Sequence, residues 1–203
     1  IGELKNRNAS AIESLHAIGI AGHMHGATLL DKNGKILHPC ILWNDTRSYK
    51  QASILDKEEN LREITGNIVF PGFTAPKLLW IQDNKPELFE QVAKVLLPAS
   101  YLGYYLTGEF FMDMSDAAGT SWLDVGNRCW SEYALKASNM RSDQMPKLLE
   151  GTQVASSVSE FIADELGIPS GVSVVAGAGD NAAAACGVGI TKEGQGFVSI
   201  GTS

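Results

Sequence analysis

A carboxylate and an amide, Asp180 and Asn181, stand directly after an apolar run that ends in glycines, within VVAGAGDNAAAACGVG at residues 174–189. The pattern predicts a buried strand over 171–179 that leads into a helix of small residues over 180–189. Open α/β sheets gather their reactive groups at such strand ends. A carboxylate near a helix N-terminus is kept ionised by the peptide dipoles, and it can accept the proton of a substrate hydroxyl. Asp180 is therefore a candidate general base; the alternative is that it only caps the helix, because Asp is a favoured N-cap residue.

The glycines of this region do not have the spacing of a common nucleotide-binding loop. Gly177, Gly179 and Gly187 do not fit GxGxxG, and GxxxxGK[ST] is absent, which disfavours a Rossmann dinucleotide site and a P-loop. Gly201 and Thr202 follow a second apolar run. A glycine and hydroxyl groups after a strand are typical of a turn that contacts phosphate, so these two residues are candidate phosphate ligands.

Two histidines, His23 and His25, flank Met24 in AGHMHGATLLD, residues 21–31. On an extended segment their side chains would share one face. A metal site is not favoured, because no nearby Asp, Glu or Cys completes a ligand set and HExxH is absent. If Met24 begins a turn, the two side chains diverge and one faces a cleft; alternatively, each is a partly buried histidine without a chemical role.

A tryptophan stands beside two polar residues at Trp43, Asn44 and Asp45. An aromatic plane with fixed donors and acceptors suits a sugar, which has an apolar face and a rim of hydroxyl groups. A tryptophan at a strand end is also common in protein cores, so both interpretations stay open at this point.

The elements that must position these residues alternate between strands and helices, which predicts an α/β fold with a mixed sheet. Periodicity and flanking residues predict strands over 16–22, 27–31, 41–43, 94–98, 171–179 and the beginning of a strand and turn over 194–203. They predict helices over 46–59, 74–84, 100–108, 130–137, 142–149, 161–167 and 180–189. Asn33-Gly34 predicts a type I′ hairpin turn, and Asn44-Asp45 predicts the cap of the helix over 46–59.

Composition excludes several classes of partner. The 203 residues carry a net charge of −7 without a basic patch, so neither nucleic acid nor an anionic membrane is an expected partner. No apolar run approaches the roughly 18 residues of a membrane span, and no signal peptide is recognisable. The three cysteines lack CxxC spacing, which indicates a cytoplasmic protein without disulfides or a zinc site. The chain begins at Ile1 and stops after an apolar run, so we expect a fragment of a longer protein.

Several stretches together resemble one family over nearly the whole chain. They are AGHMHGATLLD, ILWNDTR, GFTAPKLLW, DMSDAAGTSWLDV, AGAGDNAAAACGVG and SIGTS, and they resemble the FGGY family of carbohydrate kinases. The residues that match the spacing of the family's first signature are Gly72, Thr74, Lys77, Leu78, Trp80, Ile81, Asp83 and Asn84. The MHG triplet with WND and DAAGTSWLDV is similar to the xylulokinases of that family, although gluconokinases also contain a Met-His pair.

The resemblance implies an actin-like ATPase fold, in which two ribonuclease H-like domains enclose a cleft. Residues 1–190 then correspond to the N-terminal, sugar-binding domain without its first strands, and 191–203 to the beginning of the ATP-binding domain. Asp180 matches the catalytic base. Met24, His25 and Asn181 match sugar-contacting positions, which we extend to Trp43, Asn44 and Asp45. Gly201 and Thr202 match a phosphate-binding turn.

The implied activity is transfer of the γ-phosphate of ATP, with Mg²⁺, to the 5-hydroxyl of D-xylulose by a cytoplasmic enzyme that could form a homodimer. The chain alone is expected to be inactive. His23 departs from the xylulokinases that the chain resembles, which usually have Gln or Glu at this position. The alternatives are a ribulokinase or gluconokinase of the same family and a non-catalytic sugar-binding module. A metal-dependent hydrolase that uses His23 and His25 is a third, weaker hypothesis.

Overall fold

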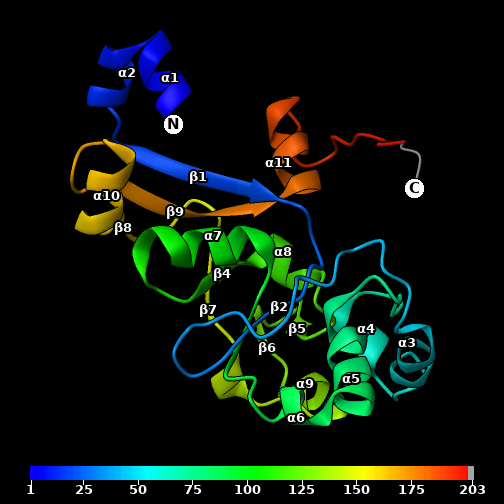
Figure 1. The fold of residues 1–203 in the computed structure, drawn as a ribbon. Coiled ribbons are helices and arrows are strands. Elements are labelled where there is room, and N and C mark those ends of the chain that lie inside the picture. Colours follow the sequence, from blue (N-terminus) through cyan, green and yellow to red (C-terminus); the bar gives the residue numbers. More distant parts are fainter. Residues whose placement is uncertain (201–203) are drawn as a thin grey trace.

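The computed structural model describes residues 1–200 of the chain, as an α/β arrangement (Figure 1). Its main sheet has three strands in the order β1-β9-β8, with β1 and β9 parallel and β8 antiparallel to β9. These strands are β1 (Ala17–Gly22), β8 (Val154–Ser157) and β9 (Ser173–Gly179). Because β1 and β9 are parallel, their carboxyl ends lie at the same edge of the sheet.

Six shorter strands form three two-stranded sheets below the main sheet in Figure 1. The pairs β2–β3 and β5–β6 are antiparallel, and β4–β7 is parallel. Their bounds are β2 (Thr28–Leu30), β3 (Lys94–Leu96), β4 (Phe111–Asp113), β5 (Leu123–Asp124), β6 (Cys129–Trp130) and β7 (Lys147–Leu149).

Helices surround both sets of strands. The helices on the main-sheet side are α1 (Gly2–Arg7), α2 (Ala9–Glu13), α7 (Pro98–Thr107), α8 (Met114–Ala118), α10 (Glu160–Leu166) and α11 (Asp180–Gly187). The remaining helices lie with the three two-stranded sheets in the lower part of Figure 1, which we call the lower body. They are α3 (Tyr49–Leu55), α4 (Leu61–Thr65), α5 (Thr74–Asn84), α6 (Pro86–Phe89), α9 (Glu132–Ala137) and the short 3₁₀ turn η1 (Ser142–Gln144). Among residues 1–200, no helix is long and apolar enough to cross a membrane.

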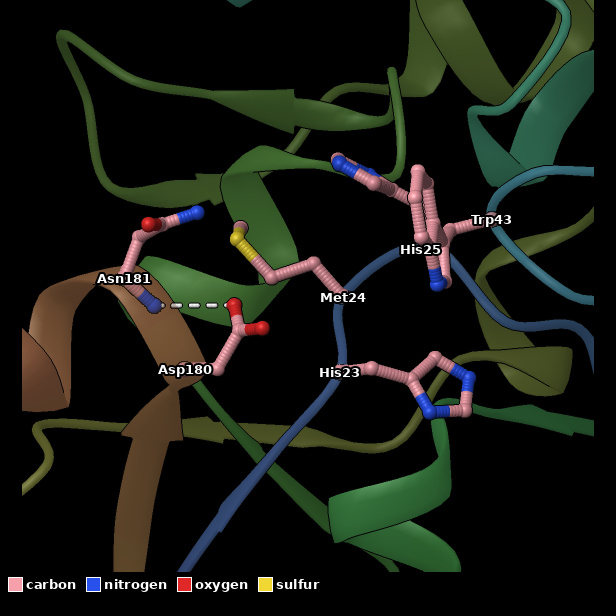
Figure 2. A pocket seen from close by; sticks show the side chains of 6 residues that line it. All are labelled: His23, Met24, His25, Trp43, Asp180 and Asn181. Carbon is pink, nitrogen blue, oxygen red and sulfur yellow. Dashed lines mark hydrogen bonds between the residues drawn. The ribbon is translucent and has the colours of Figure 1, made fainter. Parts of the chain in front are cut away.

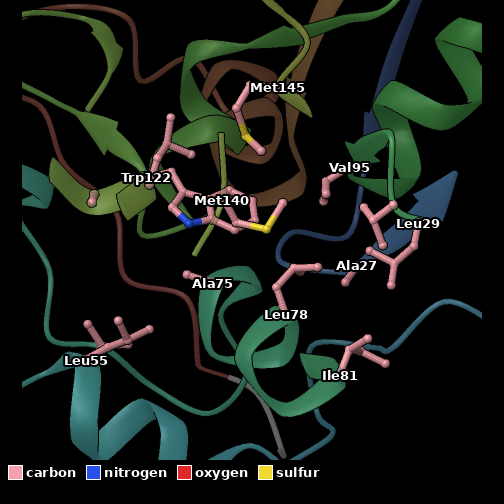
Figure 3. Packing of buried hydrophobic residues seen from close by; sticks show 14 of the residues in the cluster. Ala27, Leu29, Leu55, Ala75, Leu78, Ile81, Val95, Trp122, Met140 and Met145 are labelled. Atoms are coloured by element: carbon pink, nitrogen blue, oxygen red, sulfur yellow. The ribbon is translucent and has the colours of Figure 1, made fainter. Parts of the chain in front are cut away.

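The lower body and the main-sheet side each have their own cluster of buried apolar side chains. The larger cluster lies in the lower body between α5, β2 and the region around Trp122, and includes Leu29, Leu78 and Ile81 (Figure 3). A second cluster packs α10 and the preceding segments against the main sheet and includes Val174, which is fully buried. Burial of these side chains is the main stabilising contribution to both parts.

The turn at Asn33-Gly34 differs from the type I′ turn that we predicted. Gly34 has a φ of +77°, but Asn33 is not among the residues with positive φ. The Asp31 carboxylate accepts the backbone N–H groups of Asn33 and Lys35, at 2.8 and 2.9 Å. This Asx-type bonding holds the turn with a single left-handed residue, the pattern of a three-residue hairpin loop.

The predicted strand over 41–43 and helix over 46–59 are shorter in the structure. Only Ile41 makes a β-bridge, to Ala27, and the helix α3 begins at Tyr49. Asp45 does not cap it, because its carboxylate accepts the backbone N–H and the guanidinium of Arg47 instead.

Two further predictions were wrong. The segment 142–149 is not a helix, because Pro146 forces the preceding residue into an extended conformation, and the chain continues as β7 beside β4. Residues 195–200 form no strand: no described strand lies beside them, and Val198 and Ile200 are 84% and 92% exposed. A strand requires such a partner for its backbone groups.

Candidate active site

Six residues from three segments line a cavity of about 190 Å³: His23, Met24, His25, Trp43, Asp180 and Asn181 (Figure 2). All six are candidate residues of the sequence analysis. In Figure 2, Asp180 and Asn181 lie on one side of Met24, and His25 and Trp43 lie on the other.

Parallel pairing of β1 and β9 brings two of these segments together. Gly22 pairs with Gly179, so the last residues of both strands are in register. His23, Met24 and His25 leave the end of β1, and Asp180 begins α11 at the end of β9. The prediction that Asp180 lies at a strand end is therefore confirmed, and the pairing places the histidine segment at the same edge of the sheet.

Asp180 is not the N-cap of its helix. The N-cap is Gly179, and Asp180 is the first helical residue, with an exposed side chain. One carboxylate oxygen of Asp180 accepts the N–H of Asn181 at 2.8 Å. An exposed carboxylate that lines the cavity can accept a proton from a hydroxyl bound there.

His25 has an uncommon backbone conformation. Its φ is +69°, in the left-handed region that costs a residue with a Cβ about 1–2 kcal/mol. Two donors from the first turn of α5 hold its carbonyl oxygen: the Thr74 hydroxyl at 3.2 Å and the Lys77 ammonium at 2.7 Å. Its ring stacks on Phe73, with centroids 4.5 Å apart.

The imidazole of His25 is held in one tautomer. Nδ1 lies 2.7 Å from the carbonyl oxygen of Gly119, which can only accept, so Nδ1 carries a hydrogen. Burial lowers the pKa of His25, which favours the neutral ring. Nε2 of the neutral ring is then a hydrogen-bond acceptor. The close approach of the His25 ring to the backbone at 119 requires a glycine there, because a Cβ would lie 2.5 Å from Nδ1.

Trp43 contributes an aromatic surface to the cavity and is 44% exposed. The two polar residues beside it, Asn44 and Asp45, are not among the residues that line the cavity. Asp45 forms an ion pair with Arg47 at 2.6 Å, and this partner lowers the pKa of Asp45. The Arg47 guanidinium lies 4.9 Å from the centre of the Trp80 ring.

His23 also lines the cavity, but its Nε2 is buried and has no hydrogen-bond partner among the described residues. A Cβ at Gly26 would lie 2.8 Å from this atom and 3.0 Å from Sγ of Cys40. Among residues 1–200, no group of three or more His, Cys, Asp or Glu side chains could hold a metal ion. Gly201 and Thr202, the predicted phosphate ligands, lie outside the described residues.

Sequence reasoning gave no site role to three polar residues that contact the segments lining the cavity or lie close to them. Lys77 is fully buried behind His25, and Asp116 is fully buried with neither oxygen hydrogen-bonded. Ser115 accepts the backbone N–H of Gly179 at 3.0 Å and donates to the carboxylate of Asp113. A sequence clue to these residues exists, because polar residues interrupt the apolar stretches GFTAPKLLW and DMSDAAGTSWLDV. Only the packed structure shows which backbone groups these polar side chains contact.

Comparison with known proteins gives consistent matches. Residues 4–187 match the N-terminal domain of the FGGY family of carbohydrate kinases. A xylulose kinase from Escherichia coli K12 is 50% identical over 194 residues, which cover 95% of this chain and 40% of that protein. The chain thus spans about two fifths of the length of this relative.

Solved structures of sugar kinases are similar as well. A xyloylose kinase from Brucella ovis has a TM-score of 0.89 and 50% identity, over 92% of this chain and 38% of that one. A gluconate kinase from Lactobacillus acidophilus has a TM-score of 0.76 and 27% identity, over 81% of this chain and 34% of that one. The expected α/β fold, of the ribonuclease H-like type found in actin-like ATPases, is confirmed.

Proposed function

The chain belongs to the FGGY family of carbohydrate kinases, and we propose that it forms the sugar-binding part of an ATP-dependent kinase that phosphorylates the 5-hydroxyl of D-xylulose. The observation that carries the proposal is that Asp180 and His25 line the same cavity. The names of the relatives supply the sugar, because the Escherichia coli protein that is 50% identical is a xylulose kinase.

In this proposal, Asp180 is the general base. Its exposed carboxylate accepts the proton of the sugar hydroxyl as that oxygen attacks the γ-phosphorus of ATP and ADP leaves. His25 offers Nε2 as an acceptor for a second hydroxyl, and Asn181 offers amide donors and an acceptor. Met24 and Trp43 provide the apolar surface against which the carbon skeleton of the sugar packs.

ATP is the proposed phosphate donor, and we propose Gly201 and Thr202 as its phosphate contacts. Phosphoryl transfer commonly uses Mg²⁺ to bridge the phosphates. Residues 1–200 contain no group of three or more His, Cys, Asp or Glu side chains that could hold this ion by themselves. We also propose that 1–190 form the sugar-binding domain and that 191–203 lead into the ATP-binding domain.

Sugar binding tests the first part of the proposal. We expect addition of D-xylulose to the ¹⁵N-labelled chain to shift the amide signals of His25 and Asn181 more than those of exposed residues remote from the cavity, such as Lys57. D-Ribulose and D-gluconate are the comparison ligands. Stronger binding of gluconate would favour a gluconokinase, which the similarity to the Lactobacillus acidophilus gluconate kinase keeps as the second candidate.

Turnover tests the role of Asp180. A kinase assembled from this chain and the remaining part of the Escherichia coli relative is assayed with its Asp180→Asn variant. Asn keeps the shape of Asp but cannot accept the proton, so we expect kcat to fall at least about 100-fold, the lower contribution of a general base, with little change in sugar affinity. Unchanged turnover would contradict the assignment and favour a non-catalytic binding module.

A further inference from the structure

Lys77 is a fully buried lysine in the first turns of α5. Among the described residues, its ammonium has one hydrogen-bond acceptor, the carbonyl oxygen of His25, at 2.7 Å. No ion pair within residues 1–200 includes it. The ammonium therefore has a neutral carbonyl as its direct partner, and at longer range Cys40 and Asp45 favour its charged form.

Such burial does not stabilise the fold. Removing an ammonium from water costs free energy that one carbonyl compensates only in part, and burial accordingly lowers the pKa of Lys77 to about 8. An apolar side chain of similar length could fill the same space at lower cost. The presence of a lysine here thus requires an explanation other than packing.

The acceptor of Lys77 points to that explanation. The carbonyl belongs to His25, whose left-handed φ of +69° turns the chain three residues after the end of β1. Thr74, one helical turn before Lys77, donates to the same oxygen at 3.2 Å. Two donors on α5 thus hold the peptide group that follows His25, while Gly119 and Phe73 contact its ring.

The charge of Lys77 also acts on the ring. The groups that act on His25 electrostatically are Lys77 and His23, which lower its pKa, and Asp180, which raises it. A cation on the α5 side therefore favours the neutral imidazole, in which Nδ1 donates to Gly119 and Nε2 has a free lone pair.

We infer that Lys77 is a positioning residue, which fixes the left-handed peptide of His25 so that the neutral imidazole stands at the cavity wall with Nε2 as its acceptor atom. This inference rests on the proposed function, in which that acceptor receives a hydroxyl of the sugar. Lys77 does not touch the sugar and acts only through His25.

The test replaces Lys77 by a neutral side chain of similar length in the full chain. For Lys77→Met, we expect the Kd for D-xylulose, measured by NMR titration, to rise at least about tenfold, the equivalent of a lost hydrogen bond to a charged group. We expect the melting temperature to stay the same or rise, because an apolar residue replaces a buried charge. The ¹⁵N signals of the His25 ring should no longer be those of the Nδ1–H tautomer alone.

Lys85→Met is the matched control, because Lys85 is exposed and its ammonium contacts only His38 among the described residues. It should leave the Kd, the melting temperature and the His25 spectrum unchanged. Thr74→Val removes the second donor while keeping the side-chain shape, and it should weaken sugar binding by a smaller factor. If Lys77→Met does not fold, Thr74→Val still tests whether hydrogen bonds to the His25 carbonyl oxygen position the imidazole.

The outcomes separate the two proposals. If Lys77→Met keeps both the sugar affinity and the His25 tautomer of the wild type, the proposed role of Lys77 is overturned. A lower melting temperature with an unchanged tautomer would show that Lys77 only supports the fold, and would overturn it as well. Absence of sugar binding by the wild-type chain would contradict the proposed function, while the tautomer measurement would still decide whether Lys77 positions His25.

Discussion

Asp116 carries a carboxyl group that is fully buried, and neither of its oxygens has a hydrogen-bond partner among the described residues. Burial raises its pKa to about 8, and the nearby carboxylates of Asp113 and Asp180 add to the effect. The Asp116 carboxyl group is therefore mostly protonated in the folded chain at neutral pH.

A pH-dependent stability follows at the residue scale. The folded chain binds the proton of Asp116 more tightly than the unfolded chain, whose Asp has its ordinary pKa near 3.8. The stabilisation is complete below about pH 4 and is lost as the pH rises toward about 8, because the unfolded state then binds fewer protons. Urea unfolding from pH 5 to pH 8 should show this decline.

Asp116→Asn should reduce the slope of the free energy of unfolding against pH, because Asn does not titrate. Asp143→Asn, on an exposed residue, is the control and should leave the slope unchanged. Equal slopes in the wild type and in Asp116→Asn would show that Asp116 is not the responsible group.

At the scale of elements, a hydrogen-bonded connection between α8 and β9 supports the turn that carries Asp180. Asp113 caps α8 by accepting the N–H groups of Ser115 and Asp116, at 2.8 and 3.0 Å. The hydroxyl of Ser115 donates to Asp113 and so directs its lone pair to the N–H of Gly179, at 3.0 Å. Gly179 is the N-cap of α11, so α8 determines where that helix begins.

Ser115→Ala removes the acceptor of the Gly179 N–H. We expect a loss of about 0.5–1.5 kcal/mol in the free energy of unfolding, the usual contribution of one hydrogen bond. Hydrogen exchange at Gly179 should accelerate at least about tenfold, because its amide then lacks the hydrogen-bond partner that protects it. Ser115→Thr retains the hydroxyl and should restore protection.

Ser131→Ala is the matched control for this connection. Its hydroxyl also accepts a backbone N–H at the start of a helix, that of Ala134 at 3.2 Å, whereas the Gly179 N–H is bonded to Ser115. A similar stability loss without faster exchange at Gly179 is expected. Unchanged exchange at Gly179 in Ser115→Ala would contradict the proposed connection.

Local patterns predicted the long elements well and the short ones poorly. Helix α5 begins at Thr74 and ends at Asn84, as predicted, and β9 lies within the predicted 171–179. Each has a continuous apolar pattern and a clear boundary signal. The strands β4 and β7 have three residues each and exist because they pair with each other, which no local pattern records.

For the whole molecule, the apolar cluster of the lower body positions the loop of His25, because α5 contributes both to that cluster and to the hydrogen bonds on His25 (Figure 3). Leu78, next to Lys77, is fully buried there. The main sheet holds Asp180 through a different cluster. The two sides of the cavity thus depend on different cores.

Leu78→Ala should therefore lower the free energy of unfolding by about 2–5 kcal/mol, the cost of a cavity in a close-packed core. Ile54→Ala, at a side chain that is 60% exposed, should change it by less than about 0.5 kcal/mol. Guanidinium unfolding measures both. A small effect at Leu78 would indicate that the lower body is loosely packed.

The sequence by itself determined the α/β class, the chain positions of the long elements and the candidate residues, because hydrophobic period and residue chemistry are local properties. Only the tertiary structure decided which candidates share a cavity: His25 and Asp180 are 155 positions apart, and parallel pairing of Gly22 with Gly179 brings them together. It likewise separated Asn44 and Asp45 from that cavity and identified Lys77, Ser115 and Asp116 as neighbours of the site. Their roles depend on which distant backbone groups they meet, and such contacts form only when the chain packs.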